Sequence, residues 1–340
     1  MSRALAWVVG RGGLLGSHVA RCVASSPDEY AFWTPGMEFS WAAPEVLQTQ
    51  LDRAIGAFLG TVVSGDHKAW CLFWAAGAGI VGTTSETLAA ETAIFEHALE
   101  RTSVHLDRLR QEPRGRVPGF VFLASSAGGV YGACPDSPAT ESSVCLPVSD
   151  YGRAKLRQEA LLAKWAEVHA VSSLAGRISN LYGPGQNLDK PQGLITHLVR
   201  SLVLNRPVHL YVPLDTLRDY FHVDDCAAAI VHAVSRLIRE ATVDCAPRSI
   251  LKIFAAEQPA SIAALIGIIS WVTRRRPLVI HAAPHALTRQ QPRRLTFRTA
   301  VWRDERWQGR ISMPVGVSQV HRHLLQLFRE GKLASRLHSR

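Results

Sequence analysis

Three features of the 340-residue sequence predict an α/β fold, with a doubly wound parallel sheet and a smaller C-terminal α/β lobe. The chain opens on a short apolar run, residues 4–9, followed by a glycine-rich turn and a helical pattern. Strand and helix patterns then alternate through the first half, as expected for parallel strands joined by crossover helices. Beyond Asn180 a turn-rich loop leads into helices and short strands that mix less regularly. We therefore expect a Rossmann-type sheet in the first half and a smaller lobe over its carboxyl edge in the second.

The expected elements follow from apolar runs and their spacing. Short apolar runs predict strands at residues 4–9, 30–33, 69–74, 120–123 and 171–175. Helical patterns are expected at 17–24, at 85–109 and around Tyr151 as far as about Ala170. No repeat and no low-complexity linker marks a sharp boundary. The expected division is a nucleotide-binding domain over 1–180, a substrate lobe over 181–330 from which some segments return to the first domain, and a basic tail over 331–340.

The turn near the N-terminus has the spacing of a dinucleotide-binding site. Three glycines stand between a predicted strand and a predicted helix. The first suits a tight turn, the second lets the backbone approach a pyrophosphate, and the third lets helix and strand pack closely. The amides and partial positive charge of the helix N-terminus favour phosphates, although such a turn can also be purely structural. The cofactor-binding residues predicted here are Gly10, Arg11, Gly13, Leu14, Leu15 and Gly16.

Tyr151 and Lys155 are the residues that most directly indicate a chemical reaction. Positions i and i+4 share one face of a helix, so a phenol is expected beside an ammonium. The positive charge is expected to favour the phenolate and so to lower the pKa of the tyrosine. Such a tyrosine can exchange a proton while a nicotinamide exchanges a hydride. Alone, this spacing is typical of a solvated helix face; behind the glycine turn it predicts a catalytic pair.

The composition narrows the class of protein. Hydrophobic residues make up 47% of the chain, enough for a substantial core. No apolar stretch reaches the roughly 20 residues that span a bilayer, and the first apolar run reads as a strand rather than as a secretion signal. The six cysteines are scattered, with no C-x-x-C pair. Reduced cysteines in a cytoplasmic protein are therefore expected.

The formal net charge of +10 allows two interpretations. A basic surface built from residues 274–276, 293–294 and the tail from 332 could touch nucleic acid or anionic lipid. It could equally attract a nucleotide-sugar and a dinucleotide, or keep the protein soluble. No nucleic-acid motif accompanies the charge, so the second interpretation is preferred and nucleic acid is not expected as a partner.

With these motifs assembled, the chain resembles the extended short-chain dehydrogenases/reductases of the NAD-dependent epimerase/dehydratase family, which act on nucleotide-sugars. The resemblance covers about residues 4–330. Besides the motifs above, residues 75–77 are similar to the small-residue stretch along which the cofactor lies, and residues 125–132 are similar to the strand-end motif with the catalytic hydroxyl. The resemblance implies further cofactor contacts at Ala75, Ala76, Gly77, Tyr151 and Lys155.

Two further segments resemble the substrate-binding motifs of the family. Asn180 matches an asparagine that contacts the substrate diphosphate, and Arg218 matches an arginine that binds the same group. Tyr131, in the strand-end motif, is also assigned to the substrate. A structural alternative stays open for the arginine, which could instead pair with Asp215 or Asp219.

Three departures from the family pattern matter. Ala127 stands where many relatives carry the serine or threonine, which leaves Ser126 or Ser125 as the hydroxyl. Ser125 shares a face with Ala127 if the strand stays regular, whereas Ser126 serves only if the backbone leaves strand geometry. NAD is the favoured cofactor, but no acid ends the second strand and Arg11 could meet a 2′-phosphate, so NADP stays open. Residues 211–218 replace a glycine-rich lead-in, which leaves the identity of the substrate open.

The resemblance implies a nucleotide-sugar epimerase that works through a transient keto-sugar. Tyr151 would take the hydroxyl proton, Lys155 would tune it and bind the nicotinamide ribose, and a serine would hydrogen-bond the reacting oxygen. Residues 127–129 offer no acid, which favours an epimerase over a dehydratase, with an NADPH-dependent keto-sugar reductase as the runner-up. A non-catalytic NAD(P) sensor or an RNA-binding protein is the alternative from a different class. The expected partner is a nucleotide-diphosphate sugar, and a homodimer stays open.

No metal site is expected. His281 and His285 are four residues apart, but Pro284 lies between them and disfavours a helical pair. His321 and His323, near a terminal amphipathic helix, are too close in sequence to share one helix face. The nine tryptophans fall mostly within apolar runs and are expected in the core.

Overall fold

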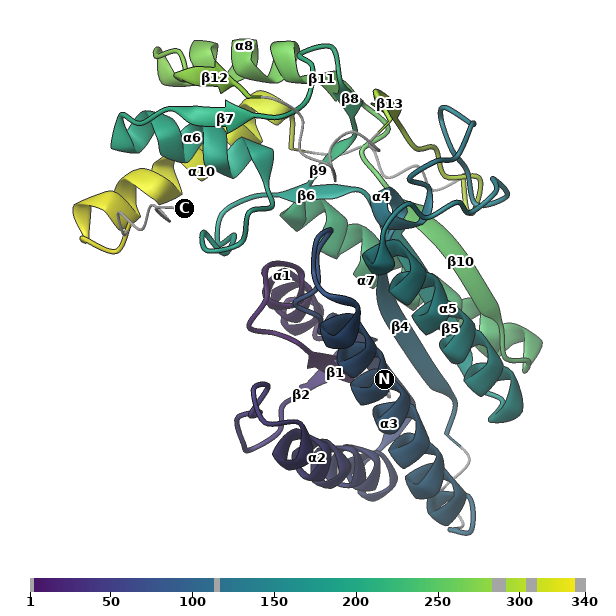
Figure 1. The fold of residues 1–340 in the computed structure, drawn as a ribbon. Helices are drawn as coiled ribbons and strands as arrows, with labels where there is room; N and C mark the ends of the chain where they lie inside the picture. The colour runs from purple at the N-terminus through teal and green to yellow at the C-terminus, as the bar shows by residue number, and fades with distance from the viewer. Residues whose placement is uncertain (1–2, 113–116, 283–291, 304–310, 334–340) are drawn as a thin grey trace. The chain divides into compact units, whose positions relative to one another are not determined.

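The computed structural model describes residues 3–112, 117–282, 292–303 and 311–333, and the chain separates into two compact units (Figure 1). Unit 1 is made of Met1–Val130, Ser149–Arg177 and Ala227–Lys252. Unit 2 is made of Tyr131–Val148, Ile178–Cys226 and Ile253–Arg340. The chain thus passes between the units several times. The functional division at residue 180 stays a prediction.

A six-stranded sheet in the order β10-β5-β4-β3-β1-β2 forms the centre of unit 1. Its strands are β1 (Arg3–Val9), β2 (Tyr30–Trp33), β3 (His67–Trp74), β4 (Gly119–Ser126), β5 (Ser172–Ile178) and β10 (Ser249–Phe254). β1 pairs in parallel with β2 on one side and with β3 on the other, and β3 pairs in parallel with β4. The central strands are buried, which explains their unbroken apolar runs. Because strand order reverses at β1, the carboxyl ends of β1 and β3 form the switch point of the sheet.

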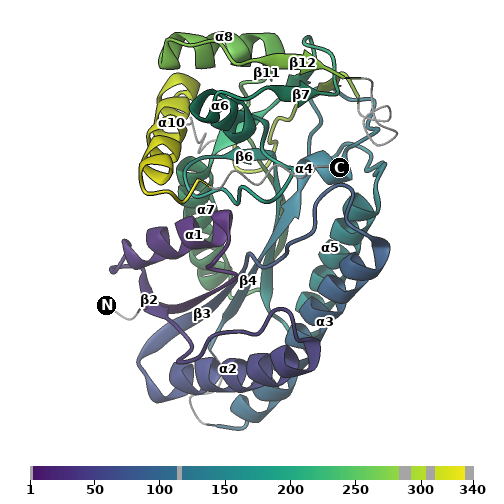
Figure 2. The same cartoon turned by 60° about the vertical axis from the view of Figure 1, so that its left-hand side comes forward.

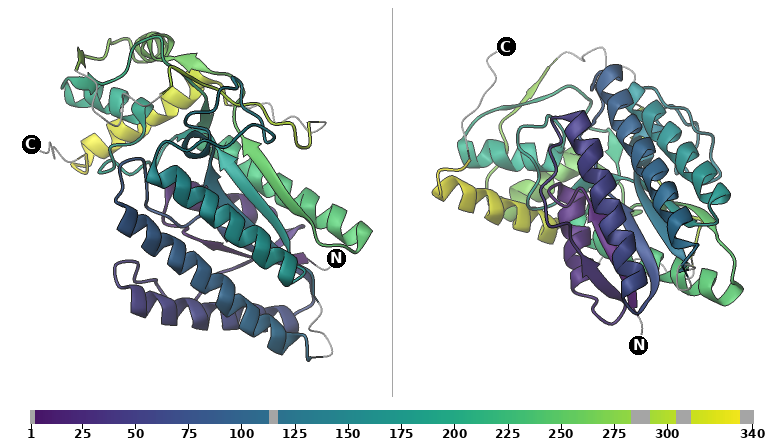
Figure 3. Two further views of the ribbon diagram at one scale, coloured as in Figure 1. Left: turned by 45° about the vertical axis from the view of Figure 1, so that its right-hand side comes forward. Right: turned by 90° about the horizontal axis from the view of Figure 1, so that it is seen from below.

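Helices cover both faces of this sheet (Figure 2). The helices of unit 1 are α1 (Leu14–Ala24), α2 (Pro44–Ser64), α3 (Ser85–Leu109), the short α4 (Ala127–Val130), α5 (Asp150–Val168) and most of α7 (Val223–Asp244). α2, α3 and α5 lie side by side over the face that carries Leu5 and Trp7 (Figure 3). α7 covers the opposite face, where the Tyr30 hydroxyl hydrogen-bonds the Ser235 hydroxyl over 2.8 Å.

The predicted fold class is confirmed, and β2 and α3 begin and end at the predicted residues. α1 begins at Leu14 rather than at Ser17, because Gly13 already has the extended backbone of an N-cap residue, with φ −85° and ψ 167°. The sequence analysis assigned no element to residues 34–68, where the structure has the 21-residue helix α2. Pro44 at the start of α2 is a favourable N-terminal residue that could have indicated it.

In its described residues, unit 2 has short strands and three helices around a second core. The strands are β6 (Asn180–Tyr182) with β9 (Tyr220–His222), β8 (Leu217–Arg218) with β11 (Ala260–Ser261) and β13 (Arg294–Leu295), and β7 (Val208–Leu210) with β12 (Val279–His281). The helices are α6 (Leu194–Leu204), α8 (Ile262–Thr273) and α10 (Met313–Arg329). Their buried faces meet in one cluster that includes Leu198, Leu265 and Val320. The amphipathic terminal helix expected near His321 is α10.

Candidate active site

The glycine turn lies at the switch point of the sheet, where the loops after β1 and β3 meet. Gly10 follows β1 with a φ of +88°, and its carbonyl accepts the amide of Gly13 over 2.9 Å. A Cβ atom at Gly10 would lie 2.6 Å from the amide nitrogen of Ala76, in the loop after β3. Both the backbone angle and this close approach therefore require glycine at position 10. In open α/β sheets, ligands bind at the carboxyl edge beside such a switch point.

Gly13 and Gly16 are glycines for different reasons. A Cβ atom at Gly16 would lie 2.2 Å from a carbonyl oxygen of the preceding turn, so glycine there lets α1 pack against the turn. A Cβ atom at Gly13 would meet a single atom within 4 Å, at 3.4 Å, and its φ of −85° suits any residue. The packing of the protein does not require glycine at position 13, and the open space there fits the approach of a pyrophosphate. Arg11 is exposed nearby, and Leu14 and Leu15 open α1.

The loop after β3 runs beside the glycine turn. The amide of Ala75 donates to the Val9 carbonyl over 3.0 Å, which joins the ends of β3 and β1. Ala76 follows, and Gly77 is exposed with a φ of +148°. The Glu91 side chain in α3 accepts hydrogen bonds from the next two amides of the loop, each over 2.7 Å. Sequence reasoning missed Glu91, because one glutamate inside a helix forms no motif and its proximity to the loop is a property of the fold.

Tyr151 lies in the first turn of α5. The Ser149 hydroxyl caps the helix by accepting the Gly152 amide over 3.2 Å. The tyrosine ring packs against Gly129, where a Cβ atom would lie 3.1 Å from a ring carbon. The Ser126 Oγ accepts the Gly129 amide over 3.1 Å, and hydrogen bonding to Ser126 lowers the pKa of the Tyr151 phenol. Tyr151 and Ser126 therefore lie together at the end of β4, each in contact with Gly129.

Lys155 lies one helical turn further along α5 and is buried. Its Nζ donates to the Ala124 carbonyl over 3.2 Å and to the Gln158 side-chain oxygen over 3.1 Å. The same Nζ is 5.9 Å from the centre of the Tyr151 ring. Burial lowers the pKa of Lys155, and nearby carboxylates, Glu91 first among them, raise it. The pair predicted from the sequence is thus brought together, with the ammonium held by β4 and α5.

The pKa of Tyr151 departs from the expectation. The sequence analysis expected Lys155 to lower it, but burial raises the pKa of this phenol. The hydrogen bond with Ser126 lowers that pKa in part, and the charge of Glu91 raises it. The charge of Lys155 does not offset the burial of the phenol. The expectation of a lowered tyrosine pKa was therefore wrong for the protein by itself.

The alternative hydroxyl, Ser125, has a different partner. It donates to Glu159 over 2.5 Å, and Glu159 pairs with Arg177 over 2.7 Å in the buried core. β4 ends at Ser126 and α4 begins at Ala127, so the backbone leaves strand geometry where a role for Ser126 requires it. Ala127 is fully buried. The two serines thus have separate surroundings, one beside Tyr151 and one beside a buried ion pair.

Two predicted substrate residues, Asn180 and Arg218, lie in unit 2 and are linked by Asp219. The Asn180 side-chain amide donates to the Asp219 carbonyl over 2.9 Å. The buried Asp219 carboxylate accepts the Ser179 hydroxyl over 2.6 Å and the Ala256 amide over 2.9 Å. Burial raises the pKa of Asp219, and these hydrogen bonds lower it. The aspartate therefore fixes the backbone between β8 and β9, where the arginine motif lies.

The aspartates considered as partners of Arg218 are engaged elsewhere. Asp215 pairs with Arg293 over 3.3 Å, and Asp219 makes the bonds just described. One guanidinium nitrogen of Arg218 donates to the Leu217 carbonyl over 2.8 Å. Burial lowers the pKa of Arg218. Arginine pKa values are so high that the group stays charged at neutral pH.

Tyr131, the third predicted substrate residue, has no exposed surface. Its ring centre lies 6.1 Å from that of Phe297. This side chain is buried in the structure, and its contact with a substrate stays a prediction.

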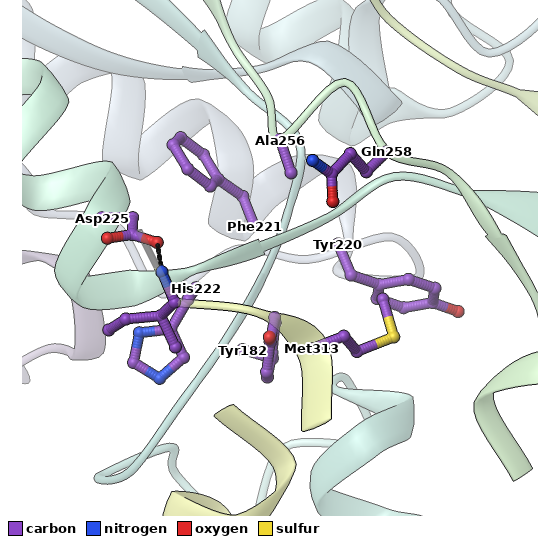
Figure 4. Close-up of a pocket in the computed structure, with 9 residues that line it drawn as sticks. Tyr182, Tyr220, Phe221, His222, Asp225, Ala256, Gln258 and Met313 are labelled. Atoms are coloured by element: carbon purple, nitrogen blue, oxygen red, sulfur yellow. Dashed lines mark hydrogen bonds between the residues drawn. The ribbon is translucent and has the colours of Figure 1, made fainter. Parts of the chain in front are cut away.

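A small pocket in unit 2 adjoins these motifs (Figure 4). In the parallel β6–β9 pair, Asn180 is opposite Tyr220 and Tyr182 is opposite His222, so the four side chains share one face of the ribbon. Three of the four line the pocket, and Asn180 does not. The lining residues are Tyr182, Tyr220, Phe221, His222, Asp225, Ala256, Gln258, Ile311 and Met313.

Metal and membrane sites were also considered. Within the described ranges, no group of three or more His, Cys, Asp or Glu side chains is arranged to hold a metal ion. His281 ends β12, and His285 lies outside the described residues. In the same part of the chain, no helix is both long and apolar enough to cross a bilayer.

The sheet order, its switch point and the glycine turn define an α/β protein of the Rossmann type. The chain belongs to the NAD dependent epimerase/dehydratase family, whose model matches residues 6–243. The family resemblance predicted from the motifs is thereby confirmed. The matched range includes the glycine turn, the Tyr151–Lys155 pair and Arg218.

The relatives differ from one another in activity. The dTDP-4-dehydro-6-deoxyglucose reductase of Escherichia coli is 33% identical over 111 residues, which are 33% of this chain and 35% of that protein. The dTDP-glucose 4,6-dehydratase of Neisseria gonorrhoeae is 26% identical over 181 residues, 49% of this chain and 51% of that protein. The matches thus span about a third to a half of these curated relatives. The UDP-glucose 4-epimerase of Thermus thermophilus, solved with NAD, has the same fold, with a TM-score of 0.72, 18% identity, and coverage of 95% of this chain and 98% of that chain.

Single alanine substitutions of Ser126 and Ser125 should separate a site effect from a fold effect. Ser126→Ala removes the bond that lowers the pKa of Tyr151, so the phenol should ionise at higher pH. Ser125→Ala removes one donor from buried Glu159 and should lower the free energy of unfolding by about 1–3 kcal/mol. Absorbance difference spectra against Tyr151→Phe follow the ionisation, and urea unfolding follows the stability. An unchanged tyrosine titration in folded Ser126→Ala would contradict the hydrogen bond.

Proposed function

We propose that the protein is an NAD(P)-dependent nucleotide-sugar epimerase that acts through a transient keto-sugar. The observation that carries this proposal is the placement of Tyr151 and Ser126 against Gly129, with Lys155 one turn behind, at the carboxyl edge of a sheet whose switch point carries the glycine turn. A protein that only bound the dinucleotide would not need a phenol, a serine hydroxyl and a buried ammonium gathered at one place. Membership of the family supports an enzyme of the epimerase or dehydratase class.

The residues at the sheet edge fit a dinucleotide. The open space at Gly13 and the first-turn amides of α1 suit a pyrophosphate. The backbone at Gly77 is exposed, and a Cβ atom there would lie 3.8 Å from Lys155 Nζ. Tyr151 and Lys155 would hold the nicotinamide ribose, and the dinucleotide, when bound, supplies the hydride acceptor and donor. The remaining assigned contacts are Gly10, Arg11, Leu14, Leu15, Gly16, Ala75 and Ala76.

Tyr151 would take the proton of the sugar hydroxyl as that carbon becomes a carbonyl, and would later return it. Ser126 would hydrogen-bond the reacting oxygen, and Lys155 would hold the ribose. Since burial raises the pKa of Tyr151, the phenol is protonated at neutral pH in the protein by itself. A cationic group brought beside it would favour the phenolate that the reaction needs.

Epimerisation is favoured over dehydration, because α4 carries no acidic side chain beside Ser126 to assist the loss of water. A keto-sugar reductase is the second candidate, supported by the 33% identity with a reductase. Denaturing the purified protein and identifying any released dinucleotide distinguishes the two. Bound NAD+ supports the epimerase cycle, and an empty site that takes up NADPH supports the reductase. A protein that neither carries nor binds a dinucleotide would contradict both.

The choice between NAD and NADP depends on the end of β2. Trp33 stands there, with its ring 5.1 Å from that of Trp7, in place of the carboxylate that commonly holds the adenosine ribose. Exposed Arg11 is available for a 2′-phosphate. NAD stays the preferred cofactor, and the affinities for NAD+ and NADP+ decide between them.

We assign the substrate to the nucleotide-diphosphate sugars. Arg218 supplies a fixed positive charge that suits a diphosphate, and Asn180 and Tyr131 are assigned to the same substrate. The UDP-glucose 4-epimerase with the same fold supports a sugar nucleotide of this kind. A cytoplasmic location and a homodimer stay predictions from the sequence.

Gly13→Val should fold like the parent, because position 13 has an ordinary φ and open space. It should nevertheless weaken dinucleotide binding about tenfold or more, because the branched side chain would occupy the space of the pyrophosphate. Titration of tryptophan fluorescence with NAD+ and NADP+ measures the affinities. Gly60→Val on α2, where a Cβ atom also meets nothing within 4 Å, is the matched control. Parent-like affinity in folded Gly13→Val would place the site elsewhere.

Tyr151→Phe should lower turnover by roughly 10²–10⁴-fold, since one acid–base group is lost, and leave dinucleotide affinity near that of the parent. Conversion of UDP-glucose to its 4-epimer is the assay. Tyr30→Phe is the matched control, because it removes a buried hydroxyl that is bonded to Ser235. Near-normal turnover in Tyr151→Phe removes this residue from the mechanism.

Arg218→Ala should weaken nucleotide-diphosphate binding by about 1.5–3 kcal/mol, the value of a charge-assisted contact. Titration calorimetry with UDP and GDP measures the loss. Arg293→Ala removes an exposed arginine of the same unit and should leave the affinity unchanged. Equal affinity of Arg218→Ala and the parent for every nucleotide tried would indicate a substrate without a diphosphate.

A further inference from the structure

Glu91 brings a carboxylate to the candidate site from α3. One of its oxygens, Oε1, accepts the amides of Ala78 and Gly79, each over 2.7 Å. Hydrogen bonds from backbone amides to a carboxylate are short and stronger than neutral ones. The loop after β3 is therefore held to α3 just past the residues assigned to the cofactor.

The other oxygen of this carboxylate borders the catalytic pair. A Cβ atom at Gly77 would lie 3.5 Å from Glu91 Oε2 and 3.8 Å from Lys155 Nζ, so both groups face the same small space. We propose that Glu91 is a positioning residue for the Tyr151–Lys155 pair, which fixes the loop after β3 and places one negative charge beside the pair. This inference rests on the proposed function, because it gives Glu91 a role in the same candidate active site.

The negative charge of Glu91 shifts the pKa values of Tyr151 and Lys155 in the same direction. Glu91 raises the pKa of Tyr151, because a negative neighbour disfavours phenolate, and raises that of Lys155, because it favours ammonium. Removing the charge should therefore let Tyr151 ionise, and Lys155 lose its proton, at lower pH.

Other charged groups around the pair have partners of their own. Glu159, which also acts on Lys155, pairs with Arg177 and accepts the Ser125 hydroxyl. Asp150, beside Tyr151 in α5, is bonded to Ser85 of α3 and to Arg153.

Glu91→Gln tests the charge while keeping an oxygen that can accept both loop amides. We expect near-parent dinucleotide affinity and a pH profile of UDP-glucose turnover whose two limbs both move to lower pH. On the rising limb, turnover relative to its maximum should increase by about two- to tenfold, since one pH unit on a limb is about tenfold in rate. Glu91→Ala should show the same displacement and weaker dinucleotide binding, because the loop loses both bonds. Glu100→Gln, an exposed position of the same helix, is the control and should match the parent.

If Glu91 had a purely structural role, its substitution would lower turnover at every pH by the same factor and leave both limbs of the pH profile in place. Unmoved limbs in Glu91→Gln would therefore overturn the inference, even if turnover fell. A titration without substrate separates this result from a failure of the proposed function: ionisation of Tyr151, read by difference spectra against Tyr151→Phe, should move to lower pH in Glu91→Gln. If it moves and no sugar nucleotide is converted, the proposed function fails and the inference about Glu91 holds. If sugar nucleotides are converted and the titration is unmoved, the inference alone fails.

Discussion

The close approach of two backbone turns, after β1 and after β3, is the constraint on which the candidate site depends. At Gly10 a single added Cβ atom would lie 2.6 Å from the neighbouring loop, and at Gly16 it would lie 2.2 Å from the turn itself. These contacts bring the start of α1 and the loop after β3 to one edge of the sheet. Because the strand order reverses at this point, the helices leave on opposite sides and the edge between them stays accessible to a ligand. Gly13, which no protein contact requires to be glycine, faces that edge.

Burial sets the proton chemistry at the same edge. Lys155 is 8% exposed, and an ammonium so placed needs acceptors, which Ala124 and Gln158 provide. The helical spacing thus predicted the right neighbours and the wrong sign for the pKa of Tyr151, which burial raises. Spacing along a helix indicates which side chains are close, whereas the direction of a pKa shift depends on desolvation and on charges from other elements.

The sequence was sufficient for five of the six strands, the glycine turn and the family, because each depends on local patterns; β10, Ser249–Phe254, was not expected. Continuous apolar runs mark buried parallel strands, and glycines at fixed spacing mark a turn that tolerates no side chain. The 21-residue helix α2 was missed although the sequence carries its signals, because its buried residues recur at helical spacing and Pro44 opens it. Glu91 was missed for a different reason. Its partners are amides of a distant loop, and nothing in the sequence near it records that contact.

The structure separates the roles of the two serines that could replace the hydroxyl missing at Ala127. Adjacent residues of a strand face opposite sides, so Ser125 and Ser126 cannot both reach Tyr151 while β4 stays regular. The strand ends at Ser126, and the turn that follows at Gly129 allows the tyrosine ring to pack against the backbone. Ser125 then serves the buried Glu159 ion pair, and Ser126 is left to the phenol. The Tyr151 phenol beside Ser126 is neutral. A cation that favours the ionised phenolate must, by linkage, bind more tightly to the protein when the phenol is ionised. Proton release at Tyr151 and the charge of the group bound beside it are thereby coupled.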